Sequence, residues 1–331
     1  MRIHFTDADI ARTRLKLGID LMWEVISSVQ VLQHSDGSLS FDPWRRRVRE
    51  SVSRDGELRA AVRTLVAVAP HAAYFPDFLT PALDGCDLDA AVDSVLSTAP
   101  RRLRAEIGRL QPTGSPAARW LDDLARGRIT ALRHLRQALQ VYYNSLFNPY
   151  RHVVDSGLRT ECAGGIERYL RTGPEGLLRW LGPGTAWQPP VLSVDYPLDR
   201  DLHLDGRGLV LIPCYFCLYH PVALADPQLS PVLVFPIRTE SRLLAAGRAG
   251  GDHLGALLGA TRALILRSVV DGCSTTRLAS LADVAPATVS HHTSVLRAAG
   301  LITTDRHENF ATHRITPLGL DVLTSGRGGK P

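Results

Sequence analysis

Small polar and basic side chains near the C-terminus, between residues 286 and 298, are spaced as one face of a helix. Apolar Val289 and Leu296 fall on the opposite face, where they would turn toward a core. In the major groove of DNA, Ser, Thr and His can contact base edges or phosphates, and Arg can bind guanine. The expected contact residues of this helix are Ala287, Thr288, Ser290, His291, Ser294 and Arg297.

A second group of residues that could bind a metal or react consists of Cys214, Cys217 and His220. Two thiolates and an imidazole at this spacing could converge on a soft metal ion, and the cysteines could also serve a metal or redox sensor. A structural zinc site needs a fourth ligand, and the sequence offers none nearby. The run LVLIPCYFCLYHP also fits a strand whose thiols pack in an apolar environment. We favour packing, and we expect no bound metal and no other cofactor.

Four aromatic residues close to helical spacing, Tyr142, Tyr143, Phe147 and Tyr150, form a third group. Their apolar rings and polar tips could line a pocket for a small-molecule effector. Core packing explains the same pattern, and we favour it because such stripes are usual in helical bundles. The sequence holds no GxSxG, HExxH, phosphate-binding GxxxxGK[ST] or strand-linked GxGxxG motif, so we expect a protein that is not an enzyme.

The polar helix is preceded by the pattern of a helix-turn-helix. A first helix is expected over 254–268 and a second over 275–282, capped by Ser274 or Thr275. After a short turn, Pro286 suits the first position of the polar helix, and Gly300 suits a left-handed C-terminal cap.

Two short strands follow, and they predict a two-stranded wing over 301–316. Its polar tip, DRHEN, would contact the DNA backbone or minor groove. The expected wing contacts are Arg306, His307, Asn309 and Arg314. A last helix begins at Pro317 and is expected to contribute to a dimer surface.

The stretches TRLASLADVAPATVSHHTSVLRAAGLI and ITPLG resemble the winged-helix domain of the ArsR/SmtB regulators. FDPWRRR, PDFLTP, PPVLSVDYP and DLHLDGRGLVLIP resemble a longer branch with its own N-terminal domain. The resemblance implies a homodimer on a near-palindromic operator, usually a repressor released by an effector. Ala285 stands where the family often has a capping Ser, and Thr293 where it often has Leu. The family's metal sites are not carried over, because the 275–282 helix lacks cysteine and the last helix offers only Asp321.

The rest of the chain suggests a mainly α fold with a small β section. Residues 1–190 are expected to form a mostly helical effector-binding or dimerising domain. Residues 191–250 are expected to hold a hairpin at Asp205-Gly206, further strands at 222–224 and 232–237, and a glycine-rich hinge. Residues 251–325 would form the DNA-binding domain, and 326–331 a tail.

Composition places the chain among ordinary globular proteins. It has 331 residues, 45% of them hydrophobic, five cysteines and a formal charge of +5. It has no run long and apolar enough for a membrane span and no export signal, so we expect a cytoplasmic protein without membrane partners. Residues 254–325 carry only +1, with six arginines against five acidic residues. This low charge keeps one alternative open, in which the winged helix docks a protein instead of DNA.

Overall fold

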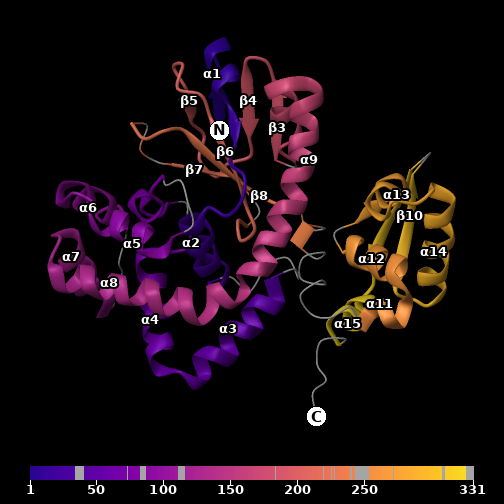
Figure 1. Cartoon of the computed structure of the whole chain (residues 1–331), viewed down its shortest axis with the longest axis horizontal. Coiled ribbons are helices and arrows are strands. Elements are labelled where there is room, and N and C mark those ends of the chain that lie inside the picture. The colour runs from indigo at the N-terminus through magenta and orange to yellow at the C-terminus, as the bar shows by residue number, and fades with distance from the viewer. Residues whose placement is uncertain are drawn as a thin grey trace. The chain divides into compact units, whose positions relative to one another are not determined.

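The computed structural model contains two compact units, Met1–Ile237 and Arg238–Pro331. Helices dominate and the sheets are small, which confirms the mainly α fold with a small β component (Figure 1). None of the helices within the described residues is long and apolar enough to cross a membrane. The structure describes the whole chain except residues 34–40, 73, 83–86, 111–115, 183, 219, 225, 227, 239–240, 243–252, 271, 308–309 and 326–331.

The first unit is largely helical between residues 20 and 181, as the apolar periodicity predicted. Aspartates start several helices: the carboxylates of Asp20, Asp55 and Asp87 each accept backbone N–H groups of the following turn. Its helices are α1 (Asp7–Arg12), α2 (Leu21–Val31), α3 (Asp42–Arg54), α4 (Gly56–Val68), α5 (Leu88–Leu96), α6 (Pro100–Ile107), α7 (Pro116–Ala125), α8 (Ile129–Tyr142) and α9 (Asn148–Trp180).

Two four-stranded sheets complete the first unit, with strand orders β3-β4-β1-β5 and β2-β6-β8-β7. Residues 2–4 and 14–15, close to the N-terminus, pair with strands about 190 residues later. The predicted β section is therefore not a separate domain, because its strands complete sheets with the start of the chain. The strands are β1 (Arg2–His4), β2 (Arg14–Leu15), β3 (Thr185–Gln188), β4 (Val191–Val194), β5 (Asp201–His203), β6 (Val210–Cys214), β7 (Val222–Ala223) and β8 (Val232–Pro236).

The hairpin expected at Asp205-Gly206 is wrong in its pairing, although the turn itself forms. Both turn residues have positive φ (52° and 80°), and Arg207 N–H donates to the Leu204 carbonyl at 3.0 Å. The flanking strands then enter different sheets: β5 pairs with β1, whereas β6 pairs with β2 and β8. A local turn signal carries no information about partners so distant in the sequence.

The long helix α9 connects the helices of the first unit to its sheets (Figure 1). It packs against β3 and β6 and breaks at Gly173, which has φ 69° and precedes Pro174. Its close approach to the segment after β6 requires Gly157, where a Cβ atom would lie 2.9 Å from the Tyr215 ring.

The second unit contains a short sheet of order β10-β11-β9 and five helices within its described residues. The single helix expected over 254–268 is wrong, because the chain breaks at Gly259 (φ 82°) into two helices. The expected hinge glycines and the tail lie outside the described residues. The elements are α11 (His253–Leu258), α12 (Ala260–Ser268), β9 (Cys273–Ser274), α13 (Thr275–Ala282), α14 (Pro286–Ala298), β10 (Ile302–His307), β11 (Phe310–Ile315) and α15 (Pro317–Ser325).

Candidate nucleic-acid interface

The two ends of helix α13 are determined by residues next to them in the sequence. The Ser274 hydroxyl accepts a hydrogen bond from Arg277 N–H at 3.3 Å and so caps the helix, as expected. Asp283 ends α13 in the left-handed conformation (φ 50°), which turns the chain into α14. Leu278 and Ala279 are buried where the two helices pack.

Helix α14 begins and ends as its sequence predicted. Pro286 occupies the first turn, and Ala285 provides no side-chain cap. At the other end, Gly300 N–H donates to the Arg297 carbonyl (2.9 Å), and Leu301 N–H donates to the Leu296 carbonyl (2.9 Å). With Gly300 at φ 71°, these bonds form a Schellman motif that orients the chain into β10.

One face of α14 is buried and the opposite face is exposed. Val289, Thr293 and Leu296 are at most 2% exposed, and Thr293 satisfies its hydroxyl by donating to the Ser290 carbonyl at 3.1 Å. A buried Thr therefore occupies a packing position on this helix. All six residues expected to contact DNA are exposed: Ala287, Thr288, Ser290, His291, Ser294 and Arg297.

Strands β10 and β11 form the antiparallel pair expected for the wing, with Ile302 opposite Ile315 and His307 opposite Phe310. Arg314 is exposed, and its Nε lies 3.7 Å from Asp305 Oδ2. Arg306 and His307 belong to β10, but their side chains are outside the described part of the structure, and Asn309 lies outside it entirely. Among the expected wing contacts, only Arg314 is placed as a side chain.

A chain of hydrogen bonds that the sequence did not predict links α14 to β10, β11 and α13. Arg297 Nη1 donates to Thr304 Oγ1 at 3.2 Å, and Thr304 Oγ1 lies 2.9 Å from Nδ1 of buried His313. His313 Nε2 lies 3.0 Å from Thr275 Oγ1. When the Thr304 hydroxyl donates its hydrogen bond to Nδ1, Nδ1 is the acceptor and a neutral His313 carries its proton on Nε2.

The network gives the exposed Arg297 guanidinium a fixed attachment on β10. Thr304 and His313 face each other in the β10–β11 register. A histidine on an inward position of a predicted strand, opposite a threonine, was the available sequence signal. This pairing of Thr304 with His313 can be recognised only when the register of the two strands is known.

His292 lies on α14 next to His291, one of the exposed residues predicted to contact DNA, and its side chain is partly buried. Burial, with smaller contributions from His291 and Arg262, lowers the pKa of His292 below its ordinary value. Its ring therefore favours the neutral form near neutral pH, and His292 Nδ1 has no hydrogen-bond partner. The two histidine rings lie 5.7 Å apart.

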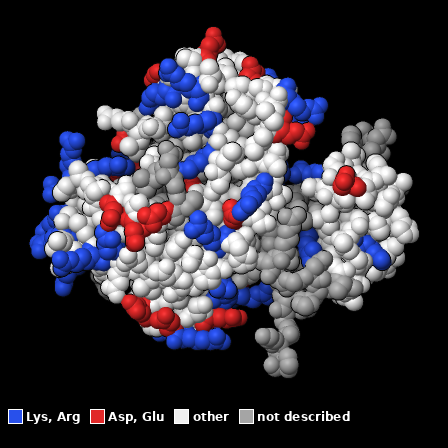
Figure 2. Space-filling view, viewed as in Figure 1, with Lys and Arg blue, Asp and Glu red and all other residues white. Residues whose placement is uncertain are grey.

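Charge is distributed differently over the two units. On the face shown in Figure 2, basic and acidic side chains are interspersed over the first unit, and the second shows few charges of either sign. This agrees with the small net charge of residues 254–325. Base contacts by short polar groups, more than a strong electrostatic field, would therefore have to supply selectivity.

Cys214, Cys217 and His220 do not converge on one point. The Cys214 thiol donates to Glu24 Oε2 at 3.3 Å, whereas the Cys217 thiol donates to the His220 carbonyl at 3.4 Å. Burial, followed by the Glu24 charge, raises the pKa of Cys214 well above its ordinary value, which keeps it a thiol. No group of three or more metal-binding side chains occurs in the described parts of the chain.

The four aromatic residues considered for a pocket are packed in the core of the first unit. Tyr142 and Phe147 are fully buried, and Tyr143 and Tyr150 are 7% and 8% exposed. Tyr142 Oη lies 2.8 Å from Ser28 Oγ, within hydrogen-bond distance. None of the four borders the cavity of about 680 Å³ described below. Their rings therefore pack in the interior of the first unit, which is the interpretation that the sequence favoured.

Comparison of the chain with protein-family models, with curated proteins and with solved structures finds no match.

Proposed function

We propose that the second unit is a winged helix-turn-helix that binds duplex DNA, and that the protein regulates transcription. The observation that carries the proposal is the exposed face of α14. Its six residues have short polar or basic side chains, apart from Ala287, and no large apolar side chain of the kind that anchors a protein-docking helix. Thr288, Ser290, His291 and Arg297 would read base edges, and β10 and β11 would form the wing.

The proposed active form is a homodimer on a near-palindromic operator. Two copies of α14 would then enter major grooves about 34 Å apart, one turn of DNA. Leu257 on α11 and Leu318 on α15 are 74% and 54% exposed, and they are apolar side chains that a dimer contact would cover. Repression with release by an effector is the regulatory scheme that the family resemblance favours.

The test is selection from a library of random duplexes by the full chain at about 150 mM salt, because affinity depends strongly on salt. We expect enrichment of a two-fold symmetric sequence with half-sites one helical turn apart. Sedimentation of the enriched complex should give two chains per duplex. A library that stays random after repeated rounds would overturn DNA reading, and would favour the alternative of a winged helix that docks a protein.

A further inference from the structure

A cavity of about 680 Å³ lies within the first unit, where α2 meets the loops around the sheets. This volume falls in the range of small-molecule pockets, about 300 to 1,000 Å³. Its walls are rich in rings and aliphatic groups, including Trp23, Tyr74, Phe75, Tyr196 and Val222. Trp23 and Phe75 meet edge to face, with ring centroids 5.7 Å apart. Such a lining favours a ligand with a flat apolar body.

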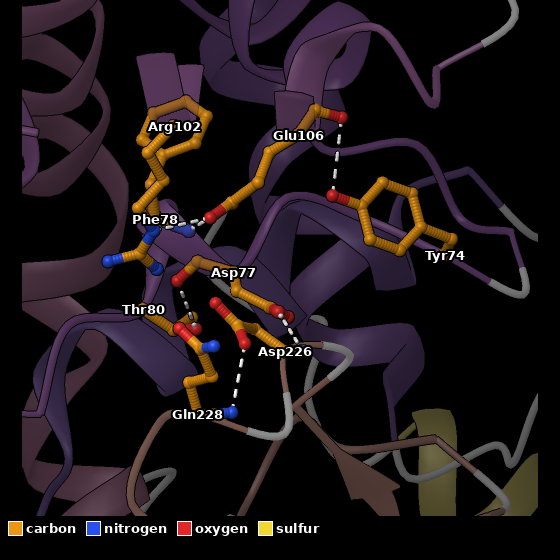
Figure 3. A network of polar contacts seen from close by, with 8 residues as sticks. All are labelled: Tyr74, Asp77, Phe78, Thr80, Arg102, Glu106, Asp226 and Gln228. Atoms are coloured by element: carbon orange, nitrogen blue, oxygen red, sulfur yellow. Dashed lines mark hydrogen bonds and ion pairs between the residues drawn. The ribbon is translucent and has the colours of Figure 1, made fainter. Parts of the chain in front are cut away.

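The wall formed by residues 74–80 is held by a network of polar contacts (Figure 3). Buried Glu106, on α6, accepts Phe78 N–H at 2.7 Å, and its backbone carbonyl accepts the Tyr74 hydroxyl at 3.2 Å. From the other side, the Asp77 carboxylate accepts Asp226 N–H at 2.9 Å. These bonds join segments far apart in sequence, so this wall is shaped before a ligand arrives.

Two arginines border the cavity, and each lies over an aromatic ring of its wall. The Arg109 guanidinium is 5.3 Å from the Tyr74 ring centroid, and the Arg200 guanidinium is 5.5 Å from that of Tyr196. Neither arginine forms an ion pair with a carboxylate of the described residues; Arg200 instead donates to the Leu224 carbonyl at 2.9 Å. Arg200 Nε also donates to Met1 Sδ at 3.2 Å, and neither guanidinium charge is balanced by a carboxylate among the described residues.

The charges of the other titratable groups at the cavity determine which ligand charge would be complementary to it. Asp77 supplies one negative charge, while His71 and His220 also border the space, the latter with Nδ1 3.3 Å from Asp195 Oδ2. Burial, and the nearby Glu106 carboxylate, raise the pKa of Tyr74, and burial raises that of Tyr196, so both hydroxyls stay neutral. Among the residues that line the cavity, two arginines against one aspartate leave an excess of one positive charge, and Glu106, behind the wall, is ion-paired with Arg102.

We propose that this cavity binds a small aromatic monoanion, such as an aryl carboxylate, with its ring against the aromatic walls and its charge met by Arg109 and Arg200. The proposal goes beyond DNA binding and does not depend on it, since every residue involved belongs to the first unit. It assigns that unit a ligand-binding role.

The test is titration of the full chain with 2-naphthoate and with its neutral counterpart 2-naphthamide, followed by calorimetry and by tryptophan fluorescence. All five tryptophans belong to the first unit, and Trp23 lines the cavity. We expect saturable binding of one naphthoate per chain, at least tenfold tighter than naphthamide. Absence of saturable naphthoate binding, or equal affinity for the two compounds, would overturn the proposal.

Variants locate the site. Arg109→Ala combined with Arg200→Ala should weaken naphthoate at least tenfold and change naphthamide little, whereas Arg104→Ala, which removes an exposed arginine outside the cavity, should leave both unchanged. Leu198→Asp places a negative charge at a half-exposed wall residue and should also weaken naphthoate. Because Leu198 is exposed, this second variant tests the site even if the double variant fails to fold. Naphthoate binding that survives both changes would contradict the proposal.

Discussion

The two units differ in how they use polar groups in their interiors. In the first, buried carboxylates bind distant backbone: Glu24 accepts Tyr215 N–H at 2.7 Å and Phe216 N–H at 3.1 Å, about 190 residues away. In the second, buried His313 lies within hydrogen-bond distance of the hydroxyls of Thr275 and Thr304, within 40 residues of it, and the predicted DNA-contact residues of α14 are exposed. Substitutions at the carboxylates should therefore affect folding, and those on α14 should affect binding.

The largest expected effect comes from Glu24→Ala in the first unit. It would leave two buried N–H groups without acceptors, each costing about 1 to 3 kcal/mol, so we expect the free energy of unfolding to fall by about 2 to 6 kcal/mol. Urea unfolding followed by tryptophan fluorescence reports this unit, because it holds every tryptophan. Glu50→Ala, at an exposed glutamate on α3, is the matched control and should change stability by less than about 0.5 kcal/mol. Equal urea midpoints for Glu24→Ala and Glu50→Ala would contradict the claim that the buried carboxylate of Glu24 stabilises the first unit.

Arg297→Ala should have the next largest effect, and on binding alone. Loss of a guanine contact would weaken selected DNA by about 1 to 3 kcal/mol, with the unfolding midpoint unchanged because Arg297 is exposed. Arg297→Lys keeps the charge but loses the planar fork, so it should recover nonselective binding more than selectivity. Arg104→Ala controls for net charge. Wild-type affinity in Arg297→Ala would refute the assigned face.

Thr304→Val tests a positioning residue, because Thr304 lies on β10 and contacts DNA in this account only through Arg297 of α14. Without the hydroxyl, Arg297 loses its attachment to β10, and we expect DNA affinity to fall by about 0.5 to 1.5 kcal/mol. Combining it with Arg297→Ala should add little, since both remove the same interaction. Fully additive losses in this double-mutant cycle would show that Thr304 does not act through Arg297.

The smallest expected effect is a pH dependence of the second unit from His292. Its pKa is lowered in the folded chain, so the unfolded chain binds the proton more readily, and stability should decline as pH falls below about 6.5 and level off below the folded pKa. Hydrogen exchange of the α14 amides between pH 5 and 8 measures this. His292→Gln should flatten the profile, while His152→Gln, at an exposed histidine of α9, should leave it intact. A wild-type profile that rises toward acid pH would reverse the sign and refute the assignment.

The second unit was largely predictable because its determinants are local. Ser274, Pro286 and Gly300 each act within one turn of their own position, so caps and boundaries follow from spacing alone. Gly259 was missed because a glycine inside an apolar period is compatible with a continuous helix until its φ is known. The link from Arg297 to His313 depends on strand register, which spacing does not provide.

The first unit was predictable in its helices but not in its sheets or its cavity. Residues 2–4 and 14–15 are too short to show a strand period, and their partners lie about 190 residues away. The described lining of the cavity comes from α2, from five residues between 71 and 77, from Arg109 and from two segments near residues 196–200 and 217–223. Such a site arises from long-range packing, and no motif in any one segment marks it.

The central claim, that the exposed face of α14 reads DNA, is tested most directly by fluorescence anisotropy with the duplex enriched by selection and a scrambled duplex, at about 150 mM salt. The wild-type chain is compared with Ser290→Glu/Ser294→Glu, which adds two negative charges to the face at exposed positions. The account predicts selective binding by the wild type and its loss in the variant, with unchanged circular dichroism. Selective binding that persists in a folded variant would contradict it.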